Sequence, residues 1–400
     1  MASARRALML VFTYTLNPLR LLDLSSLREA TELRLTALVD VRLREAFGSY
    51  EGFFDQVYYV RVHYRNHCFA EEFDAGAMEA VARESKGCDQ LRLLSFFEGD
   101  LEVTARLRDR FHLVGMSALD TRRFRDKMAM KQMVSDCRLT VPKALELDWS
   151  RDTHALFAQC ESELGRPFLV KPIALGGSLG VARISSLEQF VDCGRHRLNT
   201  AYMAEEEIIG EMLHLDSMVI DDRPTWFGCS RYNLAPLDFG RGKPVGSMPL
   251  LADDPQSHSL RDYAVAVARA LRVHESLIHI EVIRRDDQLF FIEAAARASG
   301  GLVAMVYDRM FGYNMLQAQV TSQVGLEYQL ESRDGSAYFW LFQPDGTSVR
   351  EYLAERSIFC EMVPSAAGRR VARSLVGRHD TLLASHADYR YLSDAFTAVA

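Results

Sequence analysis

Two neighbouring apolar runs in the second half of the chain constrain the fold most. Leu277–Ile283 and Leu289–Ala294 flank the short polar stretch Arg284–Gln288. Apolar runs of this length on either side of a polar turn predict two antiparallel strands joined as a β-hairpin. The chain is therefore expected to contain an antiparallel sheet built around this hairpin.

The predicted hairpin brings two carboxylates together. With the turn centred on Asp287, Glu281 stands opposite Glu293, and His279 shares the face of Glu281 because side chains alternate along a strand. Opposed carboxylates with Cβ atoms about 5 Å apart repel unless a cation lies between them. Magnesium held by one or two carboxylates and nucleotide phosphates fits such a pair. A pair of solvent-facing strand residues is the alternative.

The first part of the chain predicts an α/β layer. The apolar runs Ala7–Phe12, Leu35–Val41 and Gln56–Val62 alternate with polar helical stretches. The first run is short and no small-residue cleavage site follows it, which favours a strand over a secretory signal. No segment approaches the roughly 20 apolar residues of a membrane helix. A short strand, His112–Val114, is expected to lead into a new unit at Gly115.

A helix is predicted from Thr121 to Cys137, because apolar residues recur on one face at helical spacing. Lys127 shares this face with Met130 and Val134. A solvated surface lysine is the alternative interpretation of Lys127. An amphipathic segment, Thr153–Leu164, predicts the next helix.

A glycine-rich turn lies between two predicted strands, Pro167–Val170 and Val181–Ile184. The turn, Gly176-Gly177-Ser178-Leu179-Gly180, lacks the Lys-Ser or Lys-Thr and the helix start of a P-loop, so we expect a flexible hairpin lid over phosphates. An ordinary β-turn is the alternative. Lys171, at the end of the first strand, is a point charge suited to phosphate. Ser185 and Glu188 predict a capping box for the helix that follows.

The remaining segments are predicted to form a further strand, a long loop, a helix and a closing subdomain. A strand, Met212–Ile220, follows the acidic connector Glu205-Glu206-Glu207. The Gly- and Pro-rich segment Arg231–Pro255 is expected to form a long loop over a site. The helix after it presents Leu260, Tyr263, Ala264, Val267 and Leu271 on one face. The tail from Glu327 alternates strand-like and basic pieces.

Charge and cysteine content exclude some classes of protein. The net charge of −7 and pI near 5.9 disfavour a protein that binds nucleic acid through a broad basic surface. Seven cysteines without a C-x-x-C pair indicate neither a disulfide framework nor a zinc site, and favour free thiols in the cytoplasm.

These pieces, in this order, resemble the ATP-grasp superfamily over residues 115–312, about half of the chain. Arg125-Asp126-Lys127 with Leu139–Pro142 is similar to the first ATP-lysine helix and the segment after it. Phe168–Pro172 is similar to the second ATP-lysine strand, and Gly176–Val181 to the mobile glycine-rich loop. Glu205 to Ile208 resembles the hinge that contacts adenine.

The resemblance implies an α/β (α+β) ATP-grasp fold. Its expected parts are an N-terminal α/β domain (1–118), a small glycine-loop lid domain (119–209) and a larger C-terminal antiparallel-sheet domain (210–400). Catalytic roles are implied for Arg297, Lys171 and Glu293, and magnesium ligation for Glu281 and Glu293. Nucleotide contacts are implied for Lys127, Lys171, Gly176, Gly177, Ser178, Gly180, Glu205, Glu206, Ile208 and Glu211.

One position departs from the family pattern. Many members carry asparagine two residues after the second glutamate, and this chain has Ala295. The form Glu293-Ala294-Ala295-Ala296-Arg297, followed by Gly300-Gly301, is similar to the branch that includes L-amino-acid ligases and carnosine synthase. Gly210 to Asp216 also resembles that branch. We therefore interpret the alanine as a mark of the branch.

The resemblance implies transfer of the γ-phosphoryl group of ATP to a substrate carboxylate, with Mg²⁺ or alternatively Mn²⁺. An amine then displaces phosphate from the acyl phosphate. Loading of an amino acid onto a carrier-protein thiol and a non-catalytic nucleotide-binding regulator are the alternatives. The expected partners are small amino-acid or carboxylate substrates, with no nucleic acid and no membrane. A carrier protein and a second copy of the chain stay open as partners.

Overall fold

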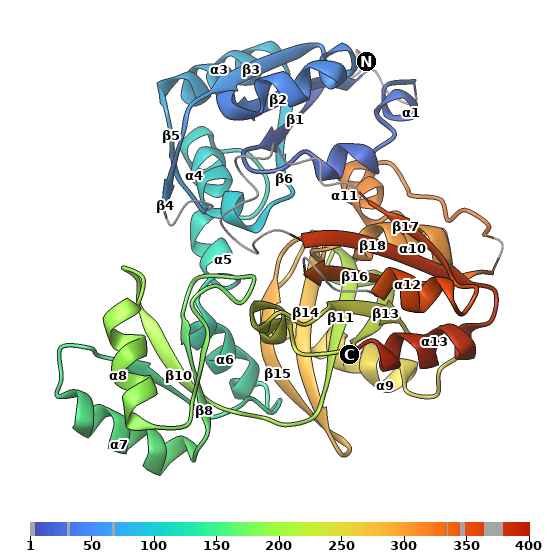
Figure 1. Ribbon diagram of the computed structural model, residues 1–400. Helices are drawn as coiled ribbons and strands as arrows, with labels where there is room; N and C mark the ends of the chain where they lie inside the picture. The colour runs from blue at the N-terminus through green and yellow to red at the C-terminus, as the bar shows by residue number, and fades with distance from the viewer. Residues whose placement is uncertain (1–4, 30–32, 66–68, 334, 345–348, 364–378) are drawn as a thin grey trace.

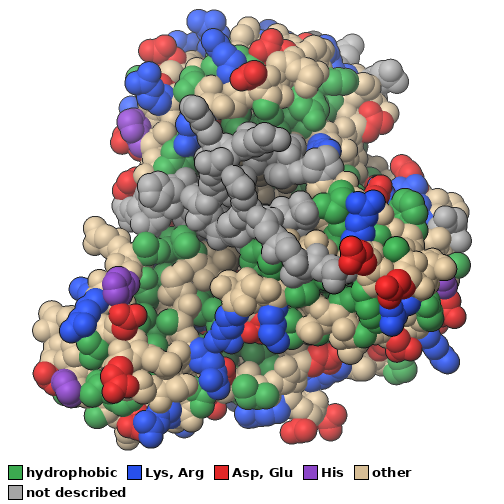
Figure 2. All heavy atoms as spheres, in the orientation of Figure 1, with side chains coloured by type: hydrophobic (Ala, Val, Ile, Leu, Met, Phe, Trp, Pro, Cys, Tyr) green, Lys and Arg blue, Asp and Glu red, His purple; other side chains and the backbone are tan. Residues whose placement is uncertain are grey.

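The computed structural model describes residues 5–29, 33–65, 69–333, 335–344, 349–363 and 379–400. Three larger sheets organise these residues, at the top, lower left and right of Figure 1, and the described residues also form one two-stranded sheet. No described helix is both long and apolar enough to cross a membrane. The six described cysteines carry free thiols. On the face shown in Figure 2, acidic and basic side chains are interspersed.

The N-terminal sheet is parallel, with strand order β3-β2-β1-β6. Its strands are β1 (Arg6–Phe12), β2 (Leu33–Asp40), β3 (Gln56–Val60) and β6 (Gln90–Ser95). The predicted third strand is too long, because Val62 begins a separate hairpin of β4 (Val62–Arg65) and β5 (Phe69–Phe73). The helices of this part are α1 (Leu24–Glu29), α2 (Arg44–Phe47), α3 (Ala75–Gly87) and α4 (Leu101–Phe111).

The second sheet is a small antiparallel one with strand order β7-β10-β8-β9. It consists of β7 (Ala144–Leu147), β8 (Phe168–Pro172), β9 (Ala182–Ile184) and β10 (Tyr202–Glu206). Helices α7 (Thr153–Leu164) and α8 (Leu187–His196) bury Leu156, Phe157 and Phe190 against this sheet. The order of helix, strand, glycine loop, strand and helix is thus confirmed.

The third sheet has eight strands in the order β15-β14-β11-β12-β13-β16-β18-β17, and every neighbouring pair is antiparallel. The predicted hairpin lies at one edge. The strands are β11 (Glu211–Ile220), β12 (Arg223–Tyr232), β13 (Val245–Pro249), β14 (Ser276–Arg285), β15 (Gln288–Ala295), β16 (Ala337–Pro344), β17 (Phe359–Met362) and β18 (His379–His386).

Helices cover this sheet on both faces. On one face, α6 (Lys127–Asp136) and α9 (Ser257–Ala270) bury an apolar cluster that includes Leu215, Ile280 and Val282. Helix α10 (Val303–Phe311) contacts β13 and β16, and α11 (Met315–Gln323) contacts β11 and β14. Helices α12 (Val349–Ala354) and α13 (Tyr389–Ala398) pack against β16, β17 and β18.

A single apolar core joins the first sheet to the third. Leu8 and Leu10 of β1 belong to the same cluster as Val306 of α10 and Leu316 of α11. The face of the N-terminal sheet that carries Leu8 and Leu10 is therefore covered by helices that come some 300 residues later in the chain.

Three sequence predictions are corrected. His112–Val114 is not a strand, because His112 adopts a left-handed conformation and ends α4. The predicted helix Thr121–Cys137 is divided into α5 (Ala118–Arg122) and α6, since the side chain of Asp126 accepts a hydrogen bond from the backbone of Ala129 and starts a new helix. The cap of α8 is Ser186, not Ser185.

The predicted loop Arg231–Pro255 is also wrong in part. It contains the short 3-10 helix η5 (Pro236–Arg241) and the buried strand β13. Gly246 lets β13 pair closely with β16, because a Cβ there would lie 1.8 Å from the carbonyl oxygen of Trp340. The glycine and proline that suggest a loop belong instead to a short buried strand. Part of the basic tail, residues 364–378, lies outside the described residues.

Candidate active site

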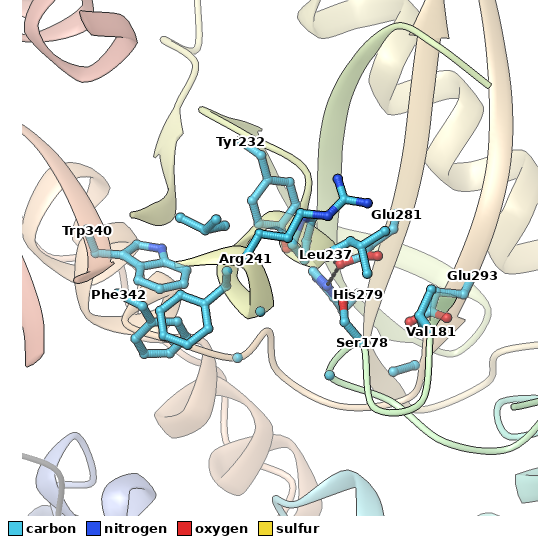
Figure 3. Close-up of a pocket in the computed structure, with 18 of the residues that line it drawn as sticks. Ser178, Val181, Tyr232, Leu237, Arg241, His279, Glu281, Glu293, Trp340 and Phe342 are labelled. Atoms are coloured by element: carbon cyan, nitrogen blue, oxygen red, sulfur yellow. Dashed lines mark hydrogen bonds and ion pairs between the residues drawn. The ribbon is translucent and has the colours of Figure 1, made fainter. Parts of the chain in front are cut away.

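A cavity of about 820 Å³ opens between the glycine loop, the segment η5 and the eight-stranded sheet. Figure 3 shows its two ends. Glu281, Glu293, His279 and Ser178 lie at the polar end, and Trp340 and Phe342 lie at the aromatic end.

The polar end depends on the register of the hairpin. Ile280 and Val282 are buried against the helices, so His279 and Glu281 face the cavity. Glu281 pairs directly with Glu293, and the ladder is irregular immediately after this pair. The predicted opposition of the two glutamates is confirmed.

Each of these two glutamates has a partner in the structure. The hydroxyl of Tyr232 donates to Glu281 Oε1 over 3.1 Å. Lys127 Nζ lies 3.1 Å from Glu293 Oε2 and also donates to the carbonyl of Leu175. Lys127 is buried at the first turn of α6, on the face of Met130 and Val134. The predicted helix face is confirmed, and the surface interpretation of Lys127 is wrong.

Two lysines share a buried glutamate, and one of them, Lys131, donates to the backbone carbonyl of Ile292 next to Glu293. Lys171 Nζ lies 2.6 Å from Glu205 Oε1, and Lys131 Nζ lies 2.5 Å from Glu205 Oε2. Burial lowers the pKa of Lys131 to about 8, and the charge of Lys171 acts in the same direction while Glu205 opposes both. Burial raises the pKa of Glu205, but the two lysines outweigh it and lower the pKa. The cluster carries a net positive charge suited to phosphate.

A second charge cluster ties the N-terminal part to the site. Glu98 accepts hydrogen bonds from Arg125 and Arg297, with Arg297 Nε at 3.1 Å. Burial would raise the pKa of Glu98, but the two guanidinium charges lower it to about 2. Arg297 is the predicted catalytic arginine, and its carboxylate partner, Glu98, begins the short 3-10 helix η4 (Glu98–Asp100) that follows β6.

The glycine loop lies against the Glu98 cluster and borders the cavity. Gly177 and Gly180 adopt positive φ, and so does Ser178 between them. A Cβ at Gly176 would lie 3.0 Å from both carboxylate oxygens of Glu98. Gly177 and Ser178 line the cavity. The loop therefore has the backbone freedom that the sequence predicts, while its role as a lid over phosphates stays a prediction.

The other predicted nucleotide residues lie around the junction of β10 and β11. Glu206 donates its backbone N–H to the carbonyl of Lys143, and Ile208 is buried. Glu211 forms an ion pair with Arg284. The contacts of these residues and of Glu205 with a nucleotide stay predictions.

Behind the polar end, one buried aspartate accepts four hydrogen bonds. Asp216 accepts from His214 Nδ1 at 2.6 Å, from His279 Nδ1 and Tyr307 at 2.9 Å, and from Ser299. Burial would raise the pKa of Asp216, but the two imidazoles lower it. Burial alone would lower the pKa of His279, and Asp216 raises it to about 9. Donors saturate this carboxylate, so it fixes His279 beside Glu281 rather than serving as an open metal site.

Residues at the aromatic end come from β16 and η5. The rings of Trp340 and Phe342 meet edge to face at 4.8 Å, and Phe239 meets Phe342 at 5.9 Å. Trp340 Nε1 donates to Ser247 Oγ over 2.9 Å, and this hydroxyl lies 2.8 Å from His214 Nε2. The aromatic end is thereby linked to the network around Asp216.

Several site residues are missing from the sequence prediction. Lys131 lies one helical turn after Lys127, so the i,i+4 spacing was a usable signal. Glu98 follows the carboxyl end of a parallel strand, a common place for functional side chains, but that strand was not predicted. Arg241 and Phe239 lie in the segment taken for an irregular loop, and only the fold places them at the cavity.

The donor set at the polar end fits a hard divalent cation. Glu281 and Glu293 offer opposed carboxylates, and both line the cavity. Carboxylate oxygens are the ligands that magnesium uses together with phosphates. Ala295 pairs with His279 in the ladder and offers no ligand atom, so the two glutamates would be the ligands from this hairpin.

Comparisons of the sequence with known proteins agree on one kind of relative. The family model described as "D-ala D-ala ligase C-terminus" matches residues 140–218. An L-arginine-specific L-amino acid ligase of Bacillus subtilis is 26% identical over 241 residues, which are 58% of this chain and 57% of the relative. A D-alanine–D-alanine ligase of Bacillus licheniformis is 30% identical over 27% of this chain and 32% of its own. The chain thus spans little more than half of the first relative and a third of the second.

Solved structures match over nearly the whole chain. An L-amino acid ligase from Bacillus licheniformis superposes with a TM-score of 0.71 at 17% identity, covering 100% of this chain and 98% of that one. An N5-carboxyaminoimidazole synthetase from Staphylococcus aureus complexed with ADP also superposes with a TM-score of 0.71. Its identity is 11%, and the match covers 99% of this chain and 97% of that one. These matches show the fold, and they confirm the predicted resemblance to carboxylate-amine ligases.

Proposed function

We propose that this chain, which has the ATP-grasp fold, is an ATP- and magnesium-dependent ligase that joins a carboxylate to an amine. One observation carries the proposal. The in-register carboxylates Glu281 and Glu293 line one cavity together with Arg297 and the glycine loop, Lys127 pairs with Glu293, and Glu98 pairs with Arg297. The Lys171–Glu205 pair is connected to this site through Lys131, which binds Glu205 and donates to the carbonyl next to Glu293.

The lysines would bind the phosphates of ATP. Lys127 and Lys171 are buried, and each lies next to a carboxylate that a phosphate oxygen could replace as partner. Magnesium, held by Glu281 and Glu293, would neutralise charge on the transferring phosphoryl group. Phosphoryl transfer is accelerated mainly by positioning and charge stabilisation, and these lysines and carboxylates, together with magnesium, would supply both.

Arg297 would bind the substrate carboxylate. Its guanidinium can offer two parallel N–H groups to a carboxylate, and its hydrogen bonds to Glu98 fix its orientation. A carboxylate oxygen attacks the γ-phosphorus, the bond to the β-phosphate oxygen breaks, and ADP and an acyl phosphate form. Arg297 stabilises the negative charge on this oxygen as the bond forms.

In the second step an amine attacks the acyl carbon and inorganic phosphate leaves with the bonding electron pair. The amine loses a proton, and an amide results. The acyl phosphate would hydrolyse if water reached it, so the glycine loop is proposed to close over the polar end. Gly177 and Gly180 provide the backbone freedom for this closure.

Amino acids are the proposed substrates. The relatives include amino acid ligases by name, and the cavity is large enough for small substrates next to phosphate groups. The arginine preference in the name of one relative belongs to that protein. We also propose a cytoplasmic location, in keeping with the free thiols of the described cysteines.

The test is an ATP-consumption screen over paired amino acids with Mg²⁺, with ADP measured and hydroxylamine added to trap an acyl phosphate. ADP release that depends on an amino acid, with a hydroxamate formed, is expected. ADP release only with a carrier protein would replace the amine by a thiol acceptor. Tight nucleotide binding without ADP release from any pair would contradict the proposed function.

A further inference from the structure

The proposed binding of ATP and magnesium assigns no role to the aromatic end of the cavity. The ring of Phe342 meets Trp340, also of β16, and Phe239 of η5, and all three residues line the cavity. Trp340 and Phe342 lie at the end of the cavity away from Glu293 (Figure 3). We call these three residues the aromatic wall. Trp340 is buried, whereas Phe239 and Phe342 are half-buried and present apolar surface to the cavity.

The aromatic wall is fixed rather than loose. The indole N–H of Trp340 donates to Ser247, which contacts the His214–Asp216 network. Phe239 and Phe342 meet edge to face, which holds η5 against β16. An apolar surface that is held in place in this way exists before a ligand arrives, so a ligand loses little binding energy to its ordering.

The aromatic wall lies next to the segment that carries Arg297. Gly301 has a positive φ, and a Cβ there would lie 2.2 Å from the ring of Trp340. The indole thus occupies the space that a side chain at position 301 would need. Arg297, Gly300, Gly301 and Trp340 all line the same cavity, so this ring faces the space open to the other substituents of a carboxylate held by Arg297.

We infer that the substrate whose carboxylate is activated carries a large apolar or aromatic side chain, which lies against the aromatic wall. This inference rests on the proposed function and names the substrate class for it. Burial of such a side chain removes about 150–250 Å² of surface from water and aromatic pairs add to the gain. A small side chain such as a methyl group would leave the wall exposed.

A guanidinium side chain is the main rival occupant, since aromatic rings also bind cations. Arg241 opposes it. The side chain of Arg241 lies between the aromatic wall and Glu281 (Figure 3) and carries a positive charge into the same space. Asp238 forms an ion pair with Arg241 over 2.9 Å, so this carboxylate is not free to bind the guanidinium of a substrate. Like charges in one cavity disfavour each other, so an apolar side chain fits better.

The experiment compares L-phenylalanine, L-alanine and L-arginine as carboxylate substrates with one fixed amine, by kcat/KM for ADP release. Phenylalanine is expected to be preferred over both. In Phe342→Ala and in Phe239→Ala the preference for phenylalanine over alanine should fall about 10-fold or more. Phe359→Ala is the matched control, because Phe359 is exposed on the edge strand β17 away from the cavity, and it should keep the preference.

A binding measurement separates this inference from the proposed function. Calorimetric titration with phenylalanine in the presence of Mg-ADP needs no turnover. Binding that weakens in Phe342→Ala but not in Phe359→Ala supports the aromatic wall even if no ADP forms with any substrate. ADP formation with equal or greater preference for alanine or arginine overturns the inference while leaving the ligase activity in place. Phe239→Ala decides the matter if Phe342→Ala does not fold.

Discussion

At the scale of single residues, the lysines of the polar end already have anionic partners. Lys127 contacts Glu293, and Lys131 and Lys171 share Glu205. Burial of an unpaired charge is costly, so these carboxylates stabilise the buried lysines until phosphates arrive. Nucleotide binding is then an exchange of partners. The opposition of Glu281 and Glu293 could be predicted from strand periodicity, whereas the pairing of Arg297 with Glu98 joins residues 199 positions apart and needed the fold.

The first residue-scale prediction concerns Glu293→Gln. The change keeps the shape of the side chain but removes the charge that magnesium and Lys127 require, so the rate of ADP formation should fall at least about 100-fold. Asp287→Asn, in the exposed turn of the same hairpin, serves as the control and should keep full activity. Comparable rates in the two variants would remove Glu293 from the catalytic site.

The second residue-scale prediction concerns Asp100, a buried residue whose partner is the hydroxyl of Thr13. Burial raises the pKa of Asp100 to about 7. Since the folded state holds this proton more tightly than the unfolded state, its contribution to stability is complete below about pH 4 and is lost as pH rises through 7.

Asp100→Asn removes this titration. The free energy of unfolding of the variant, relative to the unchanged protein, should therefore rise by about 1–3 kcal/mol between pH 5 and pH 8. Denaturant titrations at both pH values measure it. Asp394→Asn, at an exposed position, should show no such pH dependence. A constant difference for Asp100→Asn would show that Asp100 is ionised throughout this range.

At the scale of helices and strands, local sequence signals worked where the segment carries its own boundary. Helix α7 matches its prediction at both ends, because Asp152 caps it and Gly165 ends it. The sequence did not predict strand β13. Its place between β12 and β16 depends on partners that are distant in the sequence, and its Gly246 and Pro249 are residues typical of loops. The predicted capping box of α8 failed by one residue, since two successive serines offer the same local signal.

This difference gives an element-scale prediction for α8. The hydroxyl of Ser186 accepts from the backbone N–H of Gln189, whereas Ser185 is bonded through its own backbone N–H to the side chain of Gln189. Ser186→Ala should lower the free energy of unfolding by about 1 kcal/mol. Ser185→Ala should change it by a few tenths at most. Thermal unfolding of the two variants decides between the two caps, and a larger loss for Ser185→Ala would contradict the assignment.

At the scale of the whole molecule, Glu98 is where three parts of the chain meet. It follows the N-terminal sheet, binds Arg125 ahead of the second sheet and Arg297 of the third, and lies against the glycine loop at Gly176. We propose the divisions 1–118, 119–209 and 210–400 as domains, with Glu98 fixing the first against the other two. The sequence could indicate three units, but it held no signal for this contact between them.

The corresponding prediction is that Glu98→Gln leaves two arginines buried without a carboxylate. Because the two buried guanidinium groups lose their anionic partner, the free energy of unfolding should fall by on the order of 3 kcal/mol. Hydrogen exchange should accelerate at the glycine loop and at the end of β6, where the contact holds the parts together. Glu102→Gln, which changes an exposed acid on α4, is the control. Unchanged exchange in both segments would show that the parts are held by their apolar core alone.

The apolar core that joins β1 to α10 and α11 also limits the order in which the protein can fold during synthesis. A ribosome that has released only the first hundred residues presents Leu8 and Leu10 before α10 and α11 exist to cover them. The aromatic wall forms later still, because β13 pairs with β16 and β16 pairs with β18, which is synthesised near the end of the chain. Contacts so distant along the chain form slowly. The newly made protein is thus expected to need a chaperone, or a pause before release, until its final strands have emerged.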